Sequence, residues 1–231
     1  MDVPSILAAL FIAVVVALMG LFVWNASTER RSRAASMSSW ARQRGWRFEE
    51  SAPHLADRFE GYPFVRGDAE RRAENVLSGR HRGREFLLYD RTHTTVQSGE
   101  GAFGWREHTV AVTEVRLRSD AVLACHERRP SLPAFDLEGA TEVRTGDDVF
   151  DTDFRTLASD PEAARAVLTP EVRRWLCERP PLARLPFRCT GSRMIMWENT
   201  YRTTVNALRG ADQLTELLER VPEDAWHSSS D

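Results

Sequence analysis

The segment ENVLSGRHRGREFLLYDRTHTTV, which runs from Glu74 to Val96, carries the strongest strand signal in the chain. Two extended stretches, Glu74–His81 and Arg84–Val96, flank Arg82-Gly83 and predict an antiparallel hairpin that turns at this dipeptide. Alternation along the second stretch divides its apolar side chains between two faces, with Phe86 and Leu88 on one and Leu87 and Tyr89 on the other.

Outward from this hairpin the chain continues as short strands and turns. We expect strands at His108–Arg118 and Ala121–Cys125, and a second hairpin that pairs Leu185–Thr190 with Arg193–Trp197 about Gly191-Ser192. Ser98–Gly104 contains three Gly and predicts a flexible loop. Gly79 and Gly83 are explained by the geometry of the first hairpin.

The second half of the chain carries clear helix starts. Asp160-Pro161-Glu162 and Thr169-Pro170-Glu171 each combine a capping side chain, a first-turn proline and an acid. They predict helices at Pro161–Leu168 and Pro170–Glu178, and a leucine-rich helix follows that ends at Pro222. Strands come first and no regular βαβ rhythm follows, so the predicted class is α+β, a mainly antiparallel sheet with a few short helices.

Ile6–Trp24 is a run of nineteen residues without a charge. As a helix it is about 28 Å long, close to the thickness of the hydrocarbon core of a bilayer. A buried helix of a soluble core would show a polar face, and this segment shows none. The sequence therefore predicts one transmembrane helix, which contacts the membrane through Ile6 to Trp24.

The charges beside this segment predict its orientation. Only Asp2 precedes it, whereas Arg30, Arg31 and Arg33 follow it. A cleaved signal peptide has the opposite order of charge. The positive-inside rule places the amino terminus outside and everything after Asn25 in the cytoplasm. We therefore expect a single-pass protein of the cell membrane, and an exported anchored domain is the alternative.

The segment 27–47 holds six Arg and one Glu, a local charge of +5. Arg30, Arg31 and Arg33 can contact anionic lipid, worth about 1 kcal/mol per residue near the surface, although fixing the topology is the simpler role. Ala34–Arg44 predicts a short helix stopped by Gly45. The expected organisation is an anchor (1–26), a basic juxtamembrane segment (27–47), one α+β domain (48–225) and a flexible tail (226–231).

The whole chain has 31 basic residues, all of them Arg, and 34 acidic residues, which give a net charge of −3. This balance does not favour nucleic acid as a partner. The absence of Lys points to a bacterium with a GC-rich genome. Cys125, Cys177 and Cys189 form no CxxC pair, which fits reduced thiols in a cytoplasm better than a disulfide framework.

The six His residues show none of the spacings of a metal site. If the first hairpin turns at Arg82-Gly83, facing residue numbers sum to 165, and His81 and His93 lie about nine positions apart, too far to share a metal. Cys125 and His126 would point to opposite faces of a strand, which argues against a Cys-His dyad.

Four carboxylates lie within seven residues, at Asp147, Asp148, Asp151 and Asp153. Carboxylates are ligands of calcium, but this spacing differs from that of an EF-hand loop. Alternation predicts an extended Phe150–Arg155, with Asp151 and Asp153 on a solvated face. We therefore expect neither a metal site nor a bound cofactor.

Two stretches resemble a family of uncharacterised actinobacterial membrane proteins with one amino-terminal span. They are GYPFVRGDAERRAENVLSGRHRGREF, from Gly61 to Phe86, and FDTDFRTLASDPEAARAVLTPEVRRWL, from Phe150 to Leu176. The leucine helix followed by Val221-Pro222 and Trp226 is similar too. The resemblance implies a similar fold and membrane attachment, and it implies no activity, cofactor or catalytic residue.

No catalytic constellation is visible in the sequence. The favoured function is therefore a membrane-tethered cytoplasmic module that binds protein or lipid and performs no chemistry. The alternative is a membrane-tethered enzyme whose residues converge only in the fold. Its first candidates are His81, Asp90, His108, Asp151 and Asp153.

Overall fold

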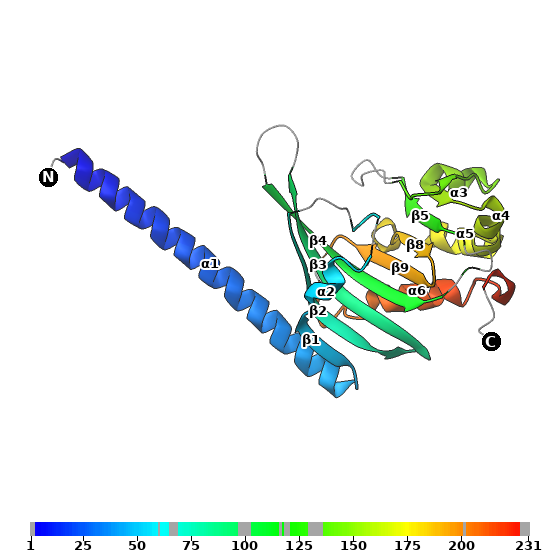
Figure 1. Ribbon diagram of the computed structural model, residues 1–231, viewed down its shortest axis with the longest axis horizontal. Coiled ribbons are helices and arrows are strands. Elements are labelled where there is room, and N and C mark those ends of the chain that lie inside the picture. The colour runs from blue at the N-terminus through cyan, green and yellow to red at the C-terminus, as the bar shows by residue number, and fades with distance from the viewer. Residues whose placement is uncertain are drawn as a thin grey trace.

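The computed structural model describes residues 3–59, 61–64, 69–96, 103–115, 117, 121–128, 136–200 and 202–226. A long amino-terminal helix projects from a domain built on one antiparallel sheet (Figure 1). The predicted α+β class, with a mainly antiparallel sheet and several short helices, is confirmed.

The helices are α1 (Val3–Gln43), α2 (Pro53–Ala56), α3 (Asp148–Asp153), α4 (Pro161–Val167), α5 (Pro170–Glu178) and α6 (Arg209–Leu218), with 3-10 turns at Pro181–Ala183 and Glu223–Ala225. The strands are β1 (Arg47–Ser51), β2 (Ala69–His81), β3 (Arg84–Val96), β4 (Phe103–Glu114), β5 (Leu123–Glu127), β6 (Thr141–Glu142), β7 (Phe154–Ala158), β8 (Phe187–Thr190) and β9 (Arg193–Glu198). The caps of α4 and α5 are as predicted, since Asp160 accepts a hydrogen bond from Glu162 N–H at 2.9 Å and Thr169 accepts one from Val172 N–H at 3.3 Å.

The strands of the described residues form one sheet in the order β1-β2-β3-β4-β9-β8-β5-β7-β6, and neighbouring strands are antiparallel. The predicted β8–β9 hairpin lies between β4 and β5. It pairs with β4 from Thr109↔Glu198 to Glu114↔Arg193. Strands from the two halves of the chain therefore share one sheet.

The β2–β3 hairpin has the predicted turn. Arg82 and Gly83 have φ values of 44° and 82°, the left-handed conformation of a type I′ turn. Near the turn the facing residue numbers sum to 165, as expected. Beyond Leu77 the register shifts by one at a bulge, where Asn75 has a φ of 51°. The shift brings Glu74 opposite Asp90, a pairing that the sequence does not predict.

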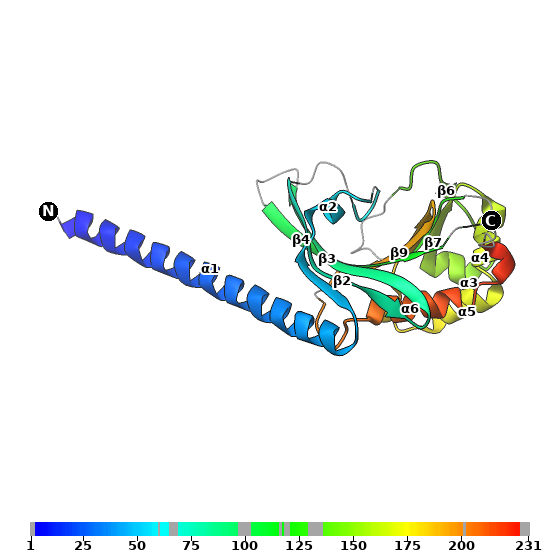
Figure 2. The ribbon, with the colours of Figure 1, turned by 60° about the horizontal axis from the view of Figure 1, so that its bottom comes forward.

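Apolar side chains cover both faces of the sheet, as the alternation in β3 predicts. Phe86 and Leu88 belong to a core cluster that includes residues of α1, α5 and α6. Leu87 and Tyr89 belong to a second cluster that includes Leu55 of α2. Figure 2 shows α2 on one side of the sheet and α5 and α6 on the other. We call these sides the α2 face and the α6 face.

α1 is one continuous helix, so the short helix predicted at Ala34–Arg44 is its last part and not a separate element. The helix ends at the predicted place, because Gly45 has a φ of 70°. Trp46 N–H donates to Ala41 O at 2.9 Å and Gly45 N–H donates to Arg42 O at 3.4 Å. This pair of hydrogen bonds is a Schellman motif, which satisfies the last carbonyl groups of the helix.

The region around α3 differs from the prediction. The sequence pattern predicts an extended Phe150–Arg155, but the helix α3 occupies Asp148–Asp153 and β7 begins at Phe154. The physical reason is a helix cap, since Asp147 accepts a hydrogen bond from Phe150 N–H at 3.1 Å. The capping signal outweighs the two-residue alternation in this short stretch.

Several boundaries also differ. β4 includes Phe103 and Gly104, the last two residues of the predicted loop, and residues 97–102 lie outside the described residues. β4 ends at Glu114 and β5 runs to Glu127, so these strands are displaced from their predicted bounds. Trp226, assigned to a flexible tail, pairs with Leu117 and packs against the core. Residues 227–231 are outside the described part.

Candidate functional site

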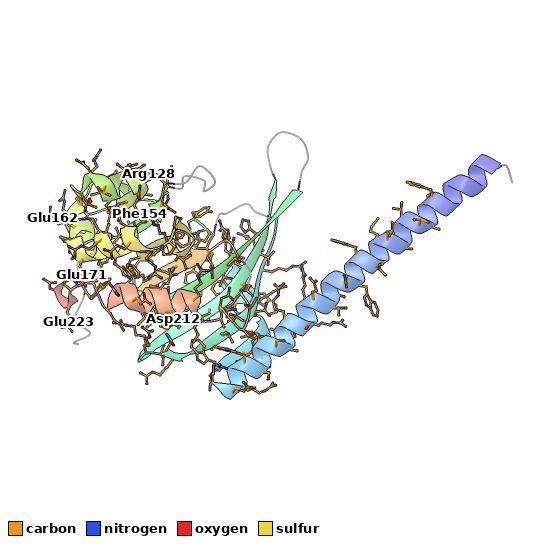
Figure 3. The ribbon with its side chains drawn as sticks, turned by 180° about the vertical axis from the view of Figure 1, so that it is seen from behind. Arg128, Phe154, Glu162, Glu171, Asp212 and Glu223 are labelled. Carbon is orange, nitrogen blue, oxygen red and sulfur yellow. The ribbon has the colours of Figure 1, made fainter. Side chains whose placement is uncertain are left out.

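The first half of α1 is an exposed apolar rod. Ten of the twelve exposed large hydrophobic side chains in the described residues lie between Phe11 and Trp24. This part of α1 projects away from the domain (Figure 3). α1 is long and apolar enough to cross a membrane, by length and composition. In water this surface would be unfavourable, so it is a candidate contact surface for lipid.

The second half of α1 is fixed in the domain core. Met37, Trp40 and Ala41 are buried on one side of the helix, and Trp46 packs beside Trp40 with ring centroids 6.2 Å apart. The Trp46 indole also lies against Gly79 of β2, where a Cβ would be 2.6 Å from Trp46 Cδ2. Gly79 therefore makes room for Trp46, which corrects its assignment to hairpin geometry. The packed domain begins before residue 48.

The structure does not bring the candidate catalytic residues together. His81 lies at the tip of the β2–β3 hairpin, and its Nε2 is 2.8 Å from Oδ1 of Asp212. Asp212 belongs to α6 (Figure 3). Asp90 and His108 occupy neighbouring strands but opposite faces, because Asp90 alternates with Tyr89 and His108 alternates with Thr109. These three side chains therefore cannot act on one substrate.

Asp151 and Asp153, the other two candidates, have structural partners. Asp151 accepts hydrogen bonds from Thr145 N–H at 3.0 Å, Thr145 Oγ1 at 2.9 Å and Gly146 N–H at 3.2 Å. Asp153 accepts one from Arg184 at 3.3 Å. Among the described residues, no group of three or more His, Cys, Asp or Glu is arranged to hold a metal ion.

The three cysteines are free thiols. Burial raises the pKa of Cys125 and of Cys189 to about 12, and burial also raises the pKa of Cys177. A thiol with a raised pKa is protonated at neutral pH and is a poor nucleophile. None of these side chains is therefore activated for covalent catalysis.

A buried polar network on the α6 face centres on Asp90. Its carboxylate accepts hydrogen bonds from Asn75 Nδ2 at 2.9 Å and from Thr109 Oγ1 at 3.3 Å, and Arg202 Nε lies 3.6 Å away. Arg202 is wholly buried and also donates to Asn75 O. Burial lowers the pKa of Arg202, while Asp90 and Glu198 raise it. The network joins the bulge of β2 to the chain after β9.

On the α2 face, Arg91 holds the segment Gly61–Phe64 against the sheet. Its NH1 group donates to Pro63 O at 2.9 Å and lies 2.8 Å from His93 Nδ1. A guanidinium can only donate, so Nδ1 of His93 is the acceptor and carries no proton. The His93 ring stacks on His108 with centroids 5.3 Å apart.

Arg188 of β8 is buried on the same face, and no acidic partner for it lies among the described residues. It is 2% exposed, and no carboxylate in the described part of the chain forms an ion pair with it. Its Nε atom has no hydrogen-bond partner there. Its guanidinium lies 5.3 Å from the Phe64 ring centroid and against Gly61, where a Cβ would be 2.6 Å from NH1. Burial lowers the pKa of Arg188 to about 10.

A groove of about 530 Å³ opens on the surface near the β2–β3 turn. Its apolar lining includes Phe59, Leu87 and Val112, which belong to or pack against the core of the α2 face. Arg58 and Arg193 flank it, with their guanidinium carbons 5.7 and 5.8 Å from the Phe59 ring centroid. This combination of apolar wall and arginine makes the groove a candidate binding site.

Little in the sequence predicts this groove. Arg58 and Phe59 precede the first hairpin, whereas Arg193 begins β9, and only the pairing of β9 with β4 brings them to one place. The alternation of Leu87 and Tyr89 onto one face is the part of the signal that the sequence does contain. Predicting the site would also have required the strand order.

These features define a class, an antiparallel α+β domain carried on a long apolar helix. No protein-family model matches the chain, and no curated protein matches it. Among solved structures it is similar to the crystal structure of the mycobacterial trehalose monomycolate transport factor A, TtfA, with a TM-score of 0.59 and 15% sequence identity. The match covers 83% of this chain and 97% of that chain. At this identity the likeness establishes the shared fold, and the neighbour is actinobacterial, as is the family that the sequence resembles.

Proposed function

We propose that the chain is a single-pass membrane protein whose domain lies in the cytoplasm and acts by binding, as a factor in lipid transport at that membrane. The observation that carries the proposal is the continuity of α1. One helix is apolar and exposed at its beginning and packed in the domain core at its end. Such a helix joins a lipid environment to a folded domain without a loop.

The charges at the base of the apolar segment support the orientation. Arg30 and Arg31 are exposed and Arg33 is partly buried, and they follow the apolar residues without an intervening acidic cluster. Basic residues at this position favour the cytoplasmic side and can contact anionic headgroups. We propose that these three arginines lie at the inner surface of the membrane.

The non-enzymatic part of the proposal has a different basis. The candidate catalytic side chains are dispersed over both faces of the sheet and the helix α3, and several are held by structural partners, among them Asp212, Arg184 and Thr145. The link to lipid transport comes from TtfA, a trehalose monomycolate transport factor that shares this fold. Fold likeness suggests this role and does not specify the lipid.

Reporter fusions test the topology. Alkaline phosphatase or green fluorescent protein is joined to the carboxyl terminus of the full chain in a bacterial host. We expect fluorescence without phosphatase activity, and a membrane pellet that resists carbonate extraction. Phosphatase activity without fluorescence would show an exported domain, and a soluble full chain would contradict the membrane anchor.

A second experiment tests the role in transport. The gene is deleted from its host, and radiolabelled lipids are followed from synthesis to the outer surface. We expect lipid to accumulate on the inner side, with rescue by the full chain but not by a chain that lacks residues 1–26. Unchanged lipid export in the deletion strain would contradict this role.

A further inference from the structure

The groove near the β2–β3 turn combines an apolar wall with guanidinium groups that form no ion pair with a carboxylate of the described residues. Phe59, Leu87 and Val112 supply the wall. In the described part of the chain neither Arg58 nor Arg193 forms an ion pair with Asp or Glu. Contact with the Phe59 ring restricts both side chains, so they lose less freedom when they bind an anion.

A further positive charge, that of Arg188, lies outside the groove lining but acts on Tyr89, which stacks on Phe59 of the groove. Arg188 is buried and lacks an acidic partner among the described residues, so its charge is poorly screened by water. Tyr89 stacks on Phe59 with the ring centroids 6.4 Å apart, and this positive charge acts on its hydroxyl group. Burial raises the pKa of Tyr89, whereas the positive charges of Arg91, Arg188 and Arg58 lower it.

We propose that this groove binds an anionic lipid, with the headgroup phosphate on Arg58 and Arg193 and the first part of an acyl chain along Phe59, Leu87 and Val112. Guanidinium groups match the geometry of phosphate oxygens and form strong charge-assisted hydrogen bonds with them. The volume of about 530 Å³ suits a headgroup and part of a chain, and not a whole lipid. The assignment of a lipid rests on the proposed function.

The charged residues that line the groove also include Arg84, Glu85 and Glu114, and Glu114 carries a negative charge that opposes phosphate binding. It lines the groove and faces Arg193 across the β4–β9 ladder. No ion pair joins these two side chains, so Glu114 leaves the guanidinium of Arg193 available while it repels a bound phosphate. Removing the negative charge of Glu114 should therefore strengthen binding, whereas removing the positive charges of Arg58 and Arg193 should weaken it.

Native mass spectrometry of the full chain in a neutral detergent can measure this binding. The probes are dioctanoyl phosphatidic acid, dioctanoyl phosphatidylcholine and inorganic phosphate. Every chain carries Arg30→Gln, Arg31→Gln and Arg33→Gln, so that the basic segment beside the apolar helix does not contribute. We expect phosphatidic acid to bind about tenfold more tightly than phosphatidylcholine, with inorganic phosphate weaker than phosphatidic acid.

The charge variants then locate the site. Arg58→Gln with Arg193→Gln should weaken binding of phosphatidic acid about tenfold, and Glu114→Gln should strengthen it about threefold. If the double variant does not fold, the single change of the exposed Arg58 should still weaken binding about threefold.

Three outcomes would overturn the inference: arginine variants that bind within twofold of the parent, equal binding of the two lipids, or inorganic phosphate that binds as tightly as phosphatidic acid. Each of these would leave the topology fusions unaffected, so failure of this inference is distinguishable from failure of the proposed function.

Discussion

The indole of Trp46 rests on the bare backbone of Gly79, and a Cβ on that glycine would lie 2.6 Å from Cδ2 of the indole. This contact fixes the end of α1 to β2. Because Trp46 also packs beside Trp40, one glycine determines how the apolar helix is held by the domain.

Gly79→Ala should therefore loosen the end of α1. The added methyl group displaces the indole, and overpacking of this kind costs about 1–3 kcal/mol of unfolding free energy. The measurement is the urea midpoint of the full chain in neutral detergent. In a chain that already carries Trp46→Ala the same substitution should cost much less, because the two residues are coupled. Equal costs in the two backgrounds would show that the contact is unimportant.

Two buried arginines should respond in opposite ways to replacement by Met. Arg202→Met leaves Asp90 buried without its cation and should cost about 3 kcal/mol of unfolding free energy. Arg188→Met removes a buried charge that lacks an acidic partner in the described part and should leave stability unchanged or raise it by about 1 kcal/mol. Urea unfolding of the two variants provides the comparison. A large loss for Arg188→Met would indicate an unrecognised partner.

The four acidic residues between Asp147 and Asp153 should stabilise the local turn and should not bind a cation. Asp151→Asn weakens three hydrogen bonds to Thr145 and Gly146 and should lower the unfolding free energy by about 1–3 kcal/mol. Asp148→Asn, whose side chain is 96% exposed, is the matched control and should have little effect. Thermal melts with and without calcium complete the test. Stabilisation by calcium that Asp148→Asn abolishes would contradict this interpretation.

His126 should make the domain sensitive to mild acid. Burial lowers its pKa below 6.5, so the folded state binds a proton less readily than the unfolded state. Its contribution to stability is therefore complete above about pH 6.5 and is lost as the pH falls through the folded pKa. Urea midpoints at pH 7.5, 6.0 and 5.0 measure the loss, which His126→Gln should reduce.

Glu142 should cause a second loss of stability, at a lower pH than the loss caused by His126. Hydrogen bonds from Arg128 and Arg155 lower its pKa, so its stabilising contribution is present above about pH 4.5 and is lost below it. The two pH ranges are separate, so the loss of stability caused by His126 can be distinguished from that caused by Glu142. As a control, replacement of the exposed His54 by Gln should leave the loss near pH 6 unchanged. An unaltered slope in the His126 variant would assign the acid sensitivity to another group.

The sequence predicts those elements that depend only on residues close to one another in the chain. The turn at Arg82-Gly83 and the caps at Asp160 and Thr169 depend on neighbouring residues alone, and the structure has them where the sequence places them. The bulge at Asn75 was missed because nothing in the alternation of β2 distinguishes it. Its partner Asp90 is fifteen residues away, and the contact depends on the register that the bulge itself creates.

The continuity of α1 was missed for a different reason. The change from apolar to basic composition near residue 26 indicates a change of environment and so predicts a boundary between elements. The backbone has no such boundary, because Gly and Pro are absent from Leu21 to Arg44 and Ala and Arg favour helix. The groove was beyond prediction, since Arg58 and Arg193 meet only through long-range strand order.

Because α1 is continuous, it fixes both the distance between the domain and the apolar segment and the rotation of the domain about the helix axis. Ala34, where burial in the domain begins, lies ten positions after Trp24, and the helix holds the two about 15 Å apart. Each inserted residue would raise the domain by about 1.5 Å and turn it by about 100° around the helix axis. Seven inserted residues would return it almost to its original direction. A partner that binds one face of the apolar part of α1 would therefore meet the same side of the sheet in every copy of the protein.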